Sequence, residues 1–266
     1  INLALVTKEK TLWAKSGHIV AQEQFIYGSP VVYRPSGKGS LTMRKTFANV
    51  YIEGEEIYAR ISLRDGRLHE YKIRGENLLA APPMMNFWRA PTDNDYGNRM
   101  QLRCAVWRKP ASSRGSIQNQ RVESAEMKDG LAVVVVHQDI YTQPASSGKI
   151  TYTFYPDGSL NIKYSAALAE GLPEVPVIGM LFVLKDGLQK VEWLGRGPHD
   201  NYIDRNLSAS VGYYEKQIDE MDFRYLNPQV SGNHTDTRRA RLTGEGQGLE
   251  VVGAPLFELN VSRYTP

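Results

Sequence analysis

The chain has 266 residues, of which 41% are hydrophobic and 23% charged, with a formal net charge of +3 at pH 7. These values are typical of globular proteins, and the length suits one large β domain or two small ones. The 32 lysines and arginines are scattered without a run or stripe, which argues against a nucleic-acid partner. No apolar stretch approaches the roughly 20 residues of a membrane-spanning helix, which argues against a membrane partner.

A single cysteine, Cys104, excludes an internal disulfide framework but does not fix the compartment. The sequence begins at Ile1 with a polar, strand-like stretch, without an initiating methionine or a signal peptide. We therefore expect a segment from inside a longer polypeptide.

Alternation of apolar and polar residues with a period of two dominates the chain and predicts β-strands. Two hairpins are predicted where such strands flank turns that contain Asp-Gly, because glycine accepts a positive φ. Their turns are residues 64–67, between strands 57–63 and 68–73, and residues 156–159, between strands 151–155 and 160–164.

Residues 131–136 form a continuous run rich in β-branched side chains, which predicts a strand buried on both faces. Further strands are expected at 18–26, 42–52, 176–184, 189–194 and 249–262. A short helix is expected at 98–106, and an exposed loop at 111–119. Because no series of long helices alternates with the strands, these elements predict an all-β sandwich rather than a parallel α/β fold.

Residues 86–97 are the densest cluster of chemically capable side chains, with Trp88, Arg89 and Asn94 among them. Aromatic faces beside planar polar groups are typical of sugar sites. The alternative is structural: the aromatic side chains anchor the core, and Arg89 with the aspartates holds a loop in place. Asp93 and Asp95, on one face of a strand, would be about 6.6 Å apart at Cα, close to the separation of an inverting glycosidase pair. Asp-Asn-Asp is also a common turn sequence.

Residues 193–205 form a second such segment, in which two glycines and a proline follow a predicted strand. His199, Asn201 and Arg205 are candidates to face a saccharide, whereas an internal ion pair between Asp204 and Arg205 is the structural alternative. Residues 227–235 form a third polar corner with the same two interpretations. The five histidines are dispersed without metal-ligand spacing, which predicts no metal site in this chain.

Four stretches of the sequence resemble, in the same order, the C-terminal region of the β-galactosidases of glycoside hydrolase family two. They are Trp13 with Gly17–Ala21 and Gln24, then Phe87–Asp95, then Trp193–Pro198 with Asn201, Tyr202, Asp204 and Arg205, and finally Phe257–Tyr264.

The resemblance implies an antiparallel supersandwich of the galactose mutarotase-like type at 28–266, truncated at its C-terminal end. It also implies that 1–27 are the last strands of a preceding immunoglobulin-like domain. The implied activity is hydrolysis of terminal β-galactosides with retention, by two glutamates that lie in another domain of the parent enzyme. The fragment alone is therefore expected to be inactive.

The resemblance further implies a bacterial-type enzyme, cytoplasmic or periplasmic, whose magnesium and sodium ions are bound outside this chain. The implied partners are the remaining domains of the parent enzyme, a galactoside substrate and further copies of the parent. Gly97–Arg103 resembles a mobile loop beside the galactosyl site, with Gly97 as its hinge, a role that suits glycine because it tolerates positive φ. The substrate-proximal candidates are Trp88, Arg89, Asp93, Asn94, Asp95, Gly97, Asn98, Arg99, His199, Asn201 and Arg205.

Two alternatives stay open at this point. One is a saccharide-binding module with its own affinity, which the aromatic and amide-rich segments 86–97 and 193–205 favour. The other is an aldose epimerase related by fold, which requires a histidine and a glutamate in one cleft.

Overall fold

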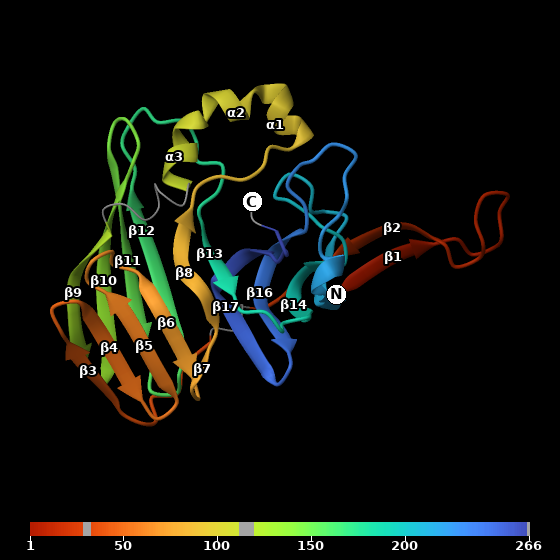
Figure 1. Cartoon of the computed structure of the whole chain (residues 1–266). Helices are drawn as coiled ribbons and strands as arrows, with labels where there is room; N and C mark the ends of the chain where they lie inside the picture. Colours follow the sequence, from red (N-terminus) through yellow and green to blue (C-terminus); the bar gives the residue numbers. More distant parts are fainter. Residues whose placement is uncertain (29–32, 112–119, 265–266) are drawn as a thin grey trace. The chain divides into compact units, whose positions relative to one another are not determined.

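The computed structural model describes residues 1–28, 33–111 and 120–264, which fall into two compact units (Figure 1). Unit 1 combines Ile1–Tyr33, Leu188–Leu226 and Ser231–Thr265, and unit 2 combines Arg34–Gly187 with Asn227–Val230. In both units the strand pairs of the described residues are antiparallel, which confirms the predicted all-β class.

Unit 2 contains three sheets. The first has the order β3-β4-β5-β6-β7, the second β12-β11-β10-β9 and the third β13-β8. The strands of the first are β3 (Leu41–Lys45), β4 (Asn49–Gly54), β5 (Ile57–Ser62), β6 (Leu68–Ile73) and β7 (Glu76–Asn77). Those of the other two are β8 (Leu79–Asn86), β9 (Gln120–Lys128), β10 (Leu131–Ile140), β11 (Ser146–Phe154), β12 (Leu160–Ala167) and β13 (Gly179–Leu184).

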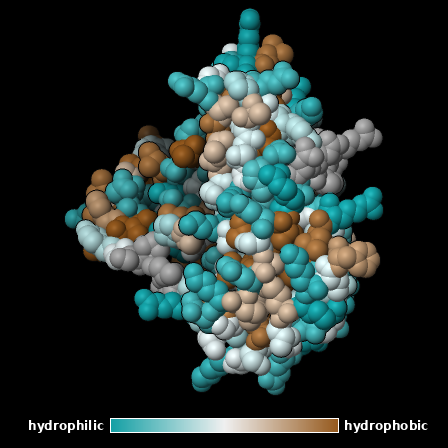
Figure 2. All heavy atoms as spheres, turned by 90° about the vertical axis from the view of Figure 1, so that its left-hand side faces the viewer, coloured by the Kyte–Doolittle hydropathy of each residue, from teal (hydrophilic) through white to brown (hydrophobic). Residues whose placement is uncertain are grey.

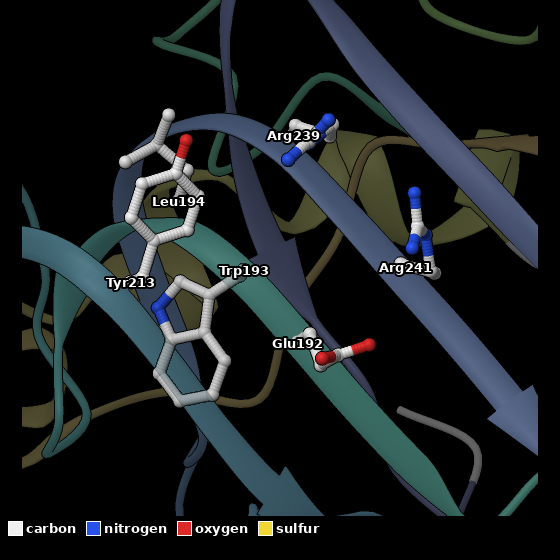
Figure 3. A pocket seen from close by; sticks show the side chains of 6 residues that line it. All are labelled: Glu192, Trp193, Leu194, Tyr213, Arg239 and Arg241. Atoms are coloured by element: carbon white, nitrogen blue, oxygen red, sulfur yellow. The ribbon is translucent and has the colours of Figure 1, made fainter.

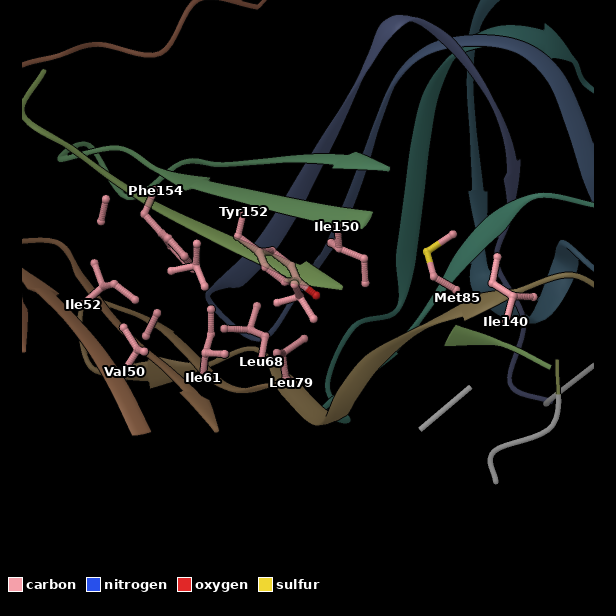
Figure 4. Packing of buried hydrophobic residues seen from close by; sticks show 14 of the residues in the cluster. Val50, Ile52, Ile61, Leu68, Leu79, Met85, Ile140, Ile150, Tyr152 and Phe154 are labelled. Carbon is pink, nitrogen blue, oxygen red and sulfur yellow. The ribbon is translucent and has the colours of Figure 1, made fainter. Parts of the chain in front are cut away.

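The core of unit 2 is formed by alternate side chains of its two larger sheets (Figure 4). Val50, Ile52 and Ile61 come from the five-stranded sheet, while Tyr152 and Phe154 come from the four-stranded one, and all are at most 1% exposed. Burying side chains of this size contributes roughly 1.5–3 kcal/mol each. Packing of two sheets face to face is the sandwich that the sequence predicts.

Unit 1 contains the hairpin of β1 (Asn2–Val6) and β2 (Ile19–Gln24) and a four-stranded sheet of order β15-β14-β16-β17. The strands of this sheet are β14 (Lys190–Gly197), β15 (Ser210–Gln217), β16 (Asn233–Gly244) and β17 (Gln247–Asn260). Every residue of β1 is exposed, so the hairpin has no core of its own within the described residues. The origin of 1–27 in an immunoglobulin-like domain stays a prediction.

Both predicted hairpins are confirmed by the strand register. Phe154 pairs with Leu160 across a turn in which Gly158 has a φ of 85°, and β5 pairs with β6 across a turn in which Gly66 has a φ of 67°. The single strand predicted at 42–52 is wrong, because β3 and β4 are separated by a tight turn. The Thr46 hydroxyl accepts hydrogen bonds from the backbone of Ala48 and Asn49 there and so reverses the chain.

The prediction that 131–136 is buried on both faces is also wrong. In β10, Ala132, Val134 and Val136 are fully buried, whereas Val133 and Val135 between them are only half-buried. The strand is central in its sheet, but only one face of that sheet packs on the core of unit 2. Most of the loop predicted at 111–119 lies outside the described residues.

On the face shown in Figure 2, hydrophobic residues are interspersed with hydrophilic ones, as is usual where apolar side chains also fill a core. The helices within 1–28, 33–111 and 120–264 are all too short or too polar to cross a lipid bilayer.

Candidate functional site

Residues 93–111 form a chain of short helical segments directly after β8 and the stretch 87–92 in unit 2 (Figure 1). They are α1 (Asp93–Asn98), α2 (Met100–Arg103), the 3₁₀ turn Ala105–Trp107 and α3 (Arg108–Ala111). The predicted helix at 98–106 therefore begins earlier and is broken. Asp93 and Asp95 lie in the first turn of α1, so the expectation that they share one face of a strand is wrong.

The start of α1 is fixed by a reciprocal capping box. The Thr92 hydroxyl accepts a hydrogen bond from the backbone of Asp95, and the Asp95 carboxylate accepts one of 2.8 Å from the backbone of Thr92. This spacing of Thr and Asp, three residues apart, was a helix-start signal that the sequence prediction missed.

Arg89 makes a bidentate ion pair with the same carboxylate, through both terminal nitrogens of its guanidinium. The Asp95 side chain is 10% exposed. Burial opposes its ionisation, but the hydrogen bonds from Arg89 and Thr92 outweigh it and hold the pKa of Asp95 below its ordinary value. The ion pair of Arg89 and Asp95 thus holds the first turn of α1 in place.

The other polar candidates of this segment are exposed on α1 or directly after it. Asp93, Asn94, Asn98 and Arg99 are all exposed. Asp93 also meets Gln229, whose side-chain carbonyl accepts from the Asp93 backbone at 3.3 Å and whose amide donates to the Asp93 carboxylate at 3.4 Å. Gln229 in the third polar corner is therefore brought to the first segment.

The hinge role of Gly97 stays a prediction. Gly97 is not among the residues with positive φ, and the left-handed residue is Arg99, with a φ of 60° at the junction of α1 and α2. The helix ends there because the left-handed geometry lets the Arg99 backbone N–H reach the carbonyls of Asp95 and Tyr96.

The aromatic residues of the segment are divided between core and surface. Phe87 is fully buried, with its ring 6.0 Å from that of Trp107 and 6.3 Å from that of Tyr164. Trp88 is half-buried, and the Arg108 guanidinium lies 4.8 Å from its ring centroid. Phe87 is thus a core anchor, and the face of Trp88 is partly occupied by a cation.

In unit 1 the candidate segment 193–205 continues from β14 into a loop held by buried polar contacts. Asn201 is fully buried, and its carbonyl oxygen accepts from the backbone and the hydroxyl of Thr235 at 2.9 and 2.7 Å. Asn233 donates to the Asn201 backbone at 3.0 Å and to Glu258 at 2.8 Å. The side chain of Asn201 therefore holds the loop together and is not turned to solvent.

Arg205 pairs with Asp200 at 3.5 Å and donates to the Tyr225 hydroxyl at 3.0 Å, while Asp204 is exposed. The predicted ion pair between Asp204 and Arg205 is therefore replaced by one with Asp200, a buried carboxylate that also accepts 2.7 Å from Tyr225. His199 is exposed and lies 3.0 Å from the Ser208 hydroxyl.

His234 is a buried histidine with one unsatisfied nitrogen. Its Nδ1 lies 3.1 Å from the Arg196 carbonyl oxygen, so Nδ1 carries the proton, and Nε2 is a buried acceptor with no partner among the described residues. Its ring centroid is 4.4 Å from that of Trp193. Burial lowers the pKa of His234 to about 4, so it is neutral near pH 7.

The structure thus brings the candidates together in two sets, one in each unit. In unit 2, Arg89 and Thr92 both contact Asp95, and Asp93 contacts Gln229. In unit 1, Asn201 contacts Thr235, and Arg205 contacts Asp200. A common saccharide site for both sets stays a prediction. Within the described residues, no three His, Cys, Asp or Glu side chains form a metal-binding cluster.

These observations define a class: an all-β protein of antiparallel sandwich architecture, with short helical segments after β8 that an ion pair holds in place. Residues 53–266 match the family model described as β-galactosidase small chain, and the chain belongs to this family. The match begins in β4 and covers the candidate segments in both units.

Curated relatives with the name β-galactosidase align with the chain along its length. The β-galactosidase of Priestia megaterium is 34% identical over 271 residues, covering 100% of this chain and 26% of its own length. That of Halalkalibacterium halodurans is 31% identical over 272 residues, with the same coverages, and that of Clostridium acetobutylicum is 30% identical over 223 residues, covering 81% and 24%. The chain spans about a quarter of the length of these relatives.

Proposed function

We propose that this chain acts as the C-terminal small-chain region of a β-galactosidase that hydrolyses terminal β-galactosides with retention. In that enzyme it contributes a wall and a loop of the substrate site and supplies no catalytic carboxylate. The observation that carries the proposal is the family match over 53–266, since the matched relatives are β-galactosidases about four times longer.

The geometry of α1 supports its assignment as the substrate-side loop. The ion pair of Arg89 and Asp95 holds the first turn of the helix, and Asn94, Asn98 and Arg99 are exposed. Amide and guanidinium groups are suited to hydrogen bonds with sugar hydroxyls.

The ionisation of Asp95 argues against its use as a general acid. A retaining pair needs one carboxyl group that stays protonated near neutral pH as the general acid. The pKa of Asp95 is lowered rather than raised, because its ion pair with Arg89 outweighs burial, and the same carboxylate is occupied by Thr92. The proposal places the catalytic pair in the rest of the enzyme, together with the magnesium and sodium ions.

A hybrid enzyme tests the proposal. The matched quarter of the Priestia megaterium β-galactosidase is replaced by this chain, and turnover of a chromogenic β-galactoside is measured. We expect turnover by the hybrid, and none by the relative without that quarter or by this chain alone. Turnover by the chain alone would overturn the non-catalytic assignment, and a folded but inactive hybrid would contradict the proposed role.

A saccharide-binding module with its own affinity is the second candidate, favoured by the exposed amides of α1. Titration calorimetry with galactose and lactose on the purified chain distinguishes the two, because the small-chain role predicts no heat at millimolar sugar. An aldose epimerase related by fold stays the third candidate, and polarimetry on fresh α-galactose would detect it.

A further inference from the structure

A row of four side chains crosses the four-stranded sheet of unit 1 at one level. Leu194 on β14 pairs with Tyr213 on β15 and with Arg239 on β16, and Arg239 pairs with Val252 on β17. Paired residues project from the same face of a sheet, so these four form a continuous strip, the Tyr–Arg row. It lies on the opposite face from Trp193, which is buried.

The Tyr–Arg row is open to solvent at its aromatic and cationic members. Tyr213 is 73% exposed, and Arg239 is also exposed. A small hollow of about 80 Å³ lies beside them, lined by Glu192, Trp193, Leu194, Tyr213, Arg239 and Arg241, whose side chains Figure 3 shows. The Trp193 side chain itself is buried on the other face of the sheet. Pockets for free small molecules have roughly 300–1,000 Å³, so the hollow suits a single side chain of a partner.

Arg239 has no acidic partner among the described residues, and the register explains why. Its direct neighbours across the strands are the apolar Leu194 and Val252. The two nearest diagonal carboxylates are already paired, Glu192 with Lys190 at 3.5 Å and Glu250 with Arg241 at 2.8 Å. The guanidinium therefore keeps its hydrogen-bonding capacity on the same face as the exposed ring of Tyr213, with Leu194 between them.

We propose that the Tyr–Arg row is an interface for another part of the same β-galactosidase polypeptide, which presents a carboxylate beside an apolar side chain. The inference rests on the proposed function. Tyrosine and arginine are enriched at interface centres, and a guanidinium binds a carboxylate through two parallel hydrogen bonds. The occupant is assigned to the same polypeptide because about three quarters of the matched relatives lies outside the region of this chain.

Chemical labelling of the hybrid enzyme tests the interface. An arginine-specific dicarbonyl reagent is applied, and the rate at Arg239 is compared by mass spectrometry with that of free N-acetylarginine. We expect Arg239 to react roughly tenfold more slowly, because a paired guanidinium at an interface centre is desolvated. Arg239→Glu should then lower the midpoint of thermal unfolding of the hybrid. Arg64→Glu is the matched control, since Arg64 is exposed in the turn after β5 and belongs to no ion pair among the described residues.

Labelling of Arg239 at the rate of N-acetylarginine would overturn the interface. Protection that disappears on dilution, together with halving of the particle mass, would assign the row to a second copy and overturn the stated occupant. Activity of the hybrid is measured on the same samples. An active hybrid with a freely labelled Arg239 rejects the interface alone, whereas a folded, inactive hybrid rejects the proposed function.

Discussion

The side-chain amide of Gln24 pairs with both backbone groups of Val211. Its Nε2 donates to the Val211 carbonyl oxygen at 2.8 Å, and its Oε1 accepts from the Val211 N–H at 2.7 Å. Val211 lies on β15, an edge strand of the four-stranded sheet, so the amide satisfies edge groups that a neighbouring strand would otherwise pair with. Gln24 thereby ties the exposed hairpin of unit 1 to its sheet.

Replacing Gln24 with alanine should lower the free energy of unfolding of unit 1 by about 1–2 kcal/mol, since two hydrogen bonds are lost. Urea unfolding checks the loss, and hydrogen exchange should show faster exchange at the Val211 amide. Gln22→Ala on the same strand is the control, because Gln22 is exposed. Equal effects of the two changes would contradict the pairing.

Asp95→Asn should destabilise unit 2 by about 2–3 kcal/mol near neutral pH, because a charged, bidentate hydrogen-bonded pair with Arg89 is removed. The pKa of Asp95 is lowered in the folded state, so its stabilisation is present above the ordinary value of about 4 and is lost as the pH falls below it.

Urea midpoints between pH 7 and pH 3 check this dependence. The difference between the original protein and Asp95→Asn should shrink as the pH falls. Asp93→Asn is the control, since Asp93 is exposed and its hydrogen bonds are with Gln229 in the described part of the chain. A difference that stays constant down to pH 3 would show that the ionised state of Asp95 is not what stabilises α1.

Gly97→Ala should stabilise the protein by about 0.5–1 kcal/mol, because alanine favours a helix over glycine and an added Cβ meets no atom within 4 Å. Gly195→Ala should do the opposite, since its Cβ would lie 2.7 Å from the Thr237 hydroxyl and 2.9 Å from its Cα. Urea unfolding measures both. A loss of stability in Gly97→Ala would indicate that this position needs a conformation other than the helical one.

His234→Gln should flatten the pH dependence of unit 1. The folded pKa of about 4 lies below the ordinary 6.5, so the unfolded state binds more protons, and stability falls as the pH drops from about 6.5 to about 4. The shift corresponds to roughly 3 kcal/mol. Urea midpoints at pH 7, 6, 5 and 4 check it, with the exposed His199→Gln as control. An equal flattening in both variants would contradict the assignment to His234.

Local patterns predicted the strands and hairpins of this fold because each depends on residues close in sequence. The Asp-Gly turns at 65–66 and 157–158 position their own strands, and β14 follows from simple alternation. The pattern at 131–136 misled because a β-branched run does not reveal whether the second face of the sheet is covered, which depends on packing with distant segments.

In the candidate sites, too, contacts between residues far apart in sequence could not be predicted from local patterns. The capping box of Thr92 and Asp95 is local and could have been read from the sequence. The ion pair of Arg205 with Asp200, and the contact of Gln229 with Asp93 across 136 residues, depend on how the chain returns in space. Sequence therefore located the polar segments, while only the structure separates the scaffold residue Asn201 from exposed groups such as Asn98.

Unit 1 is built from three separate stretches of the chain, so its parts leave the ribosome at different times. Nearly all of unit 2 lies in one stretch, Arg34–Gly187, and can acquire its core as soon as that stretch has left the ribosome. In unit 1 the hairpin of β1 and β2 has to wait until β15 has been made, since Gln24 bonds to Val211, and the sheet is complete only when β16 and β17 follow. The exposed apolar residues of the first hairpin are therefore the part of the nascent chain that is left longest without its sheet.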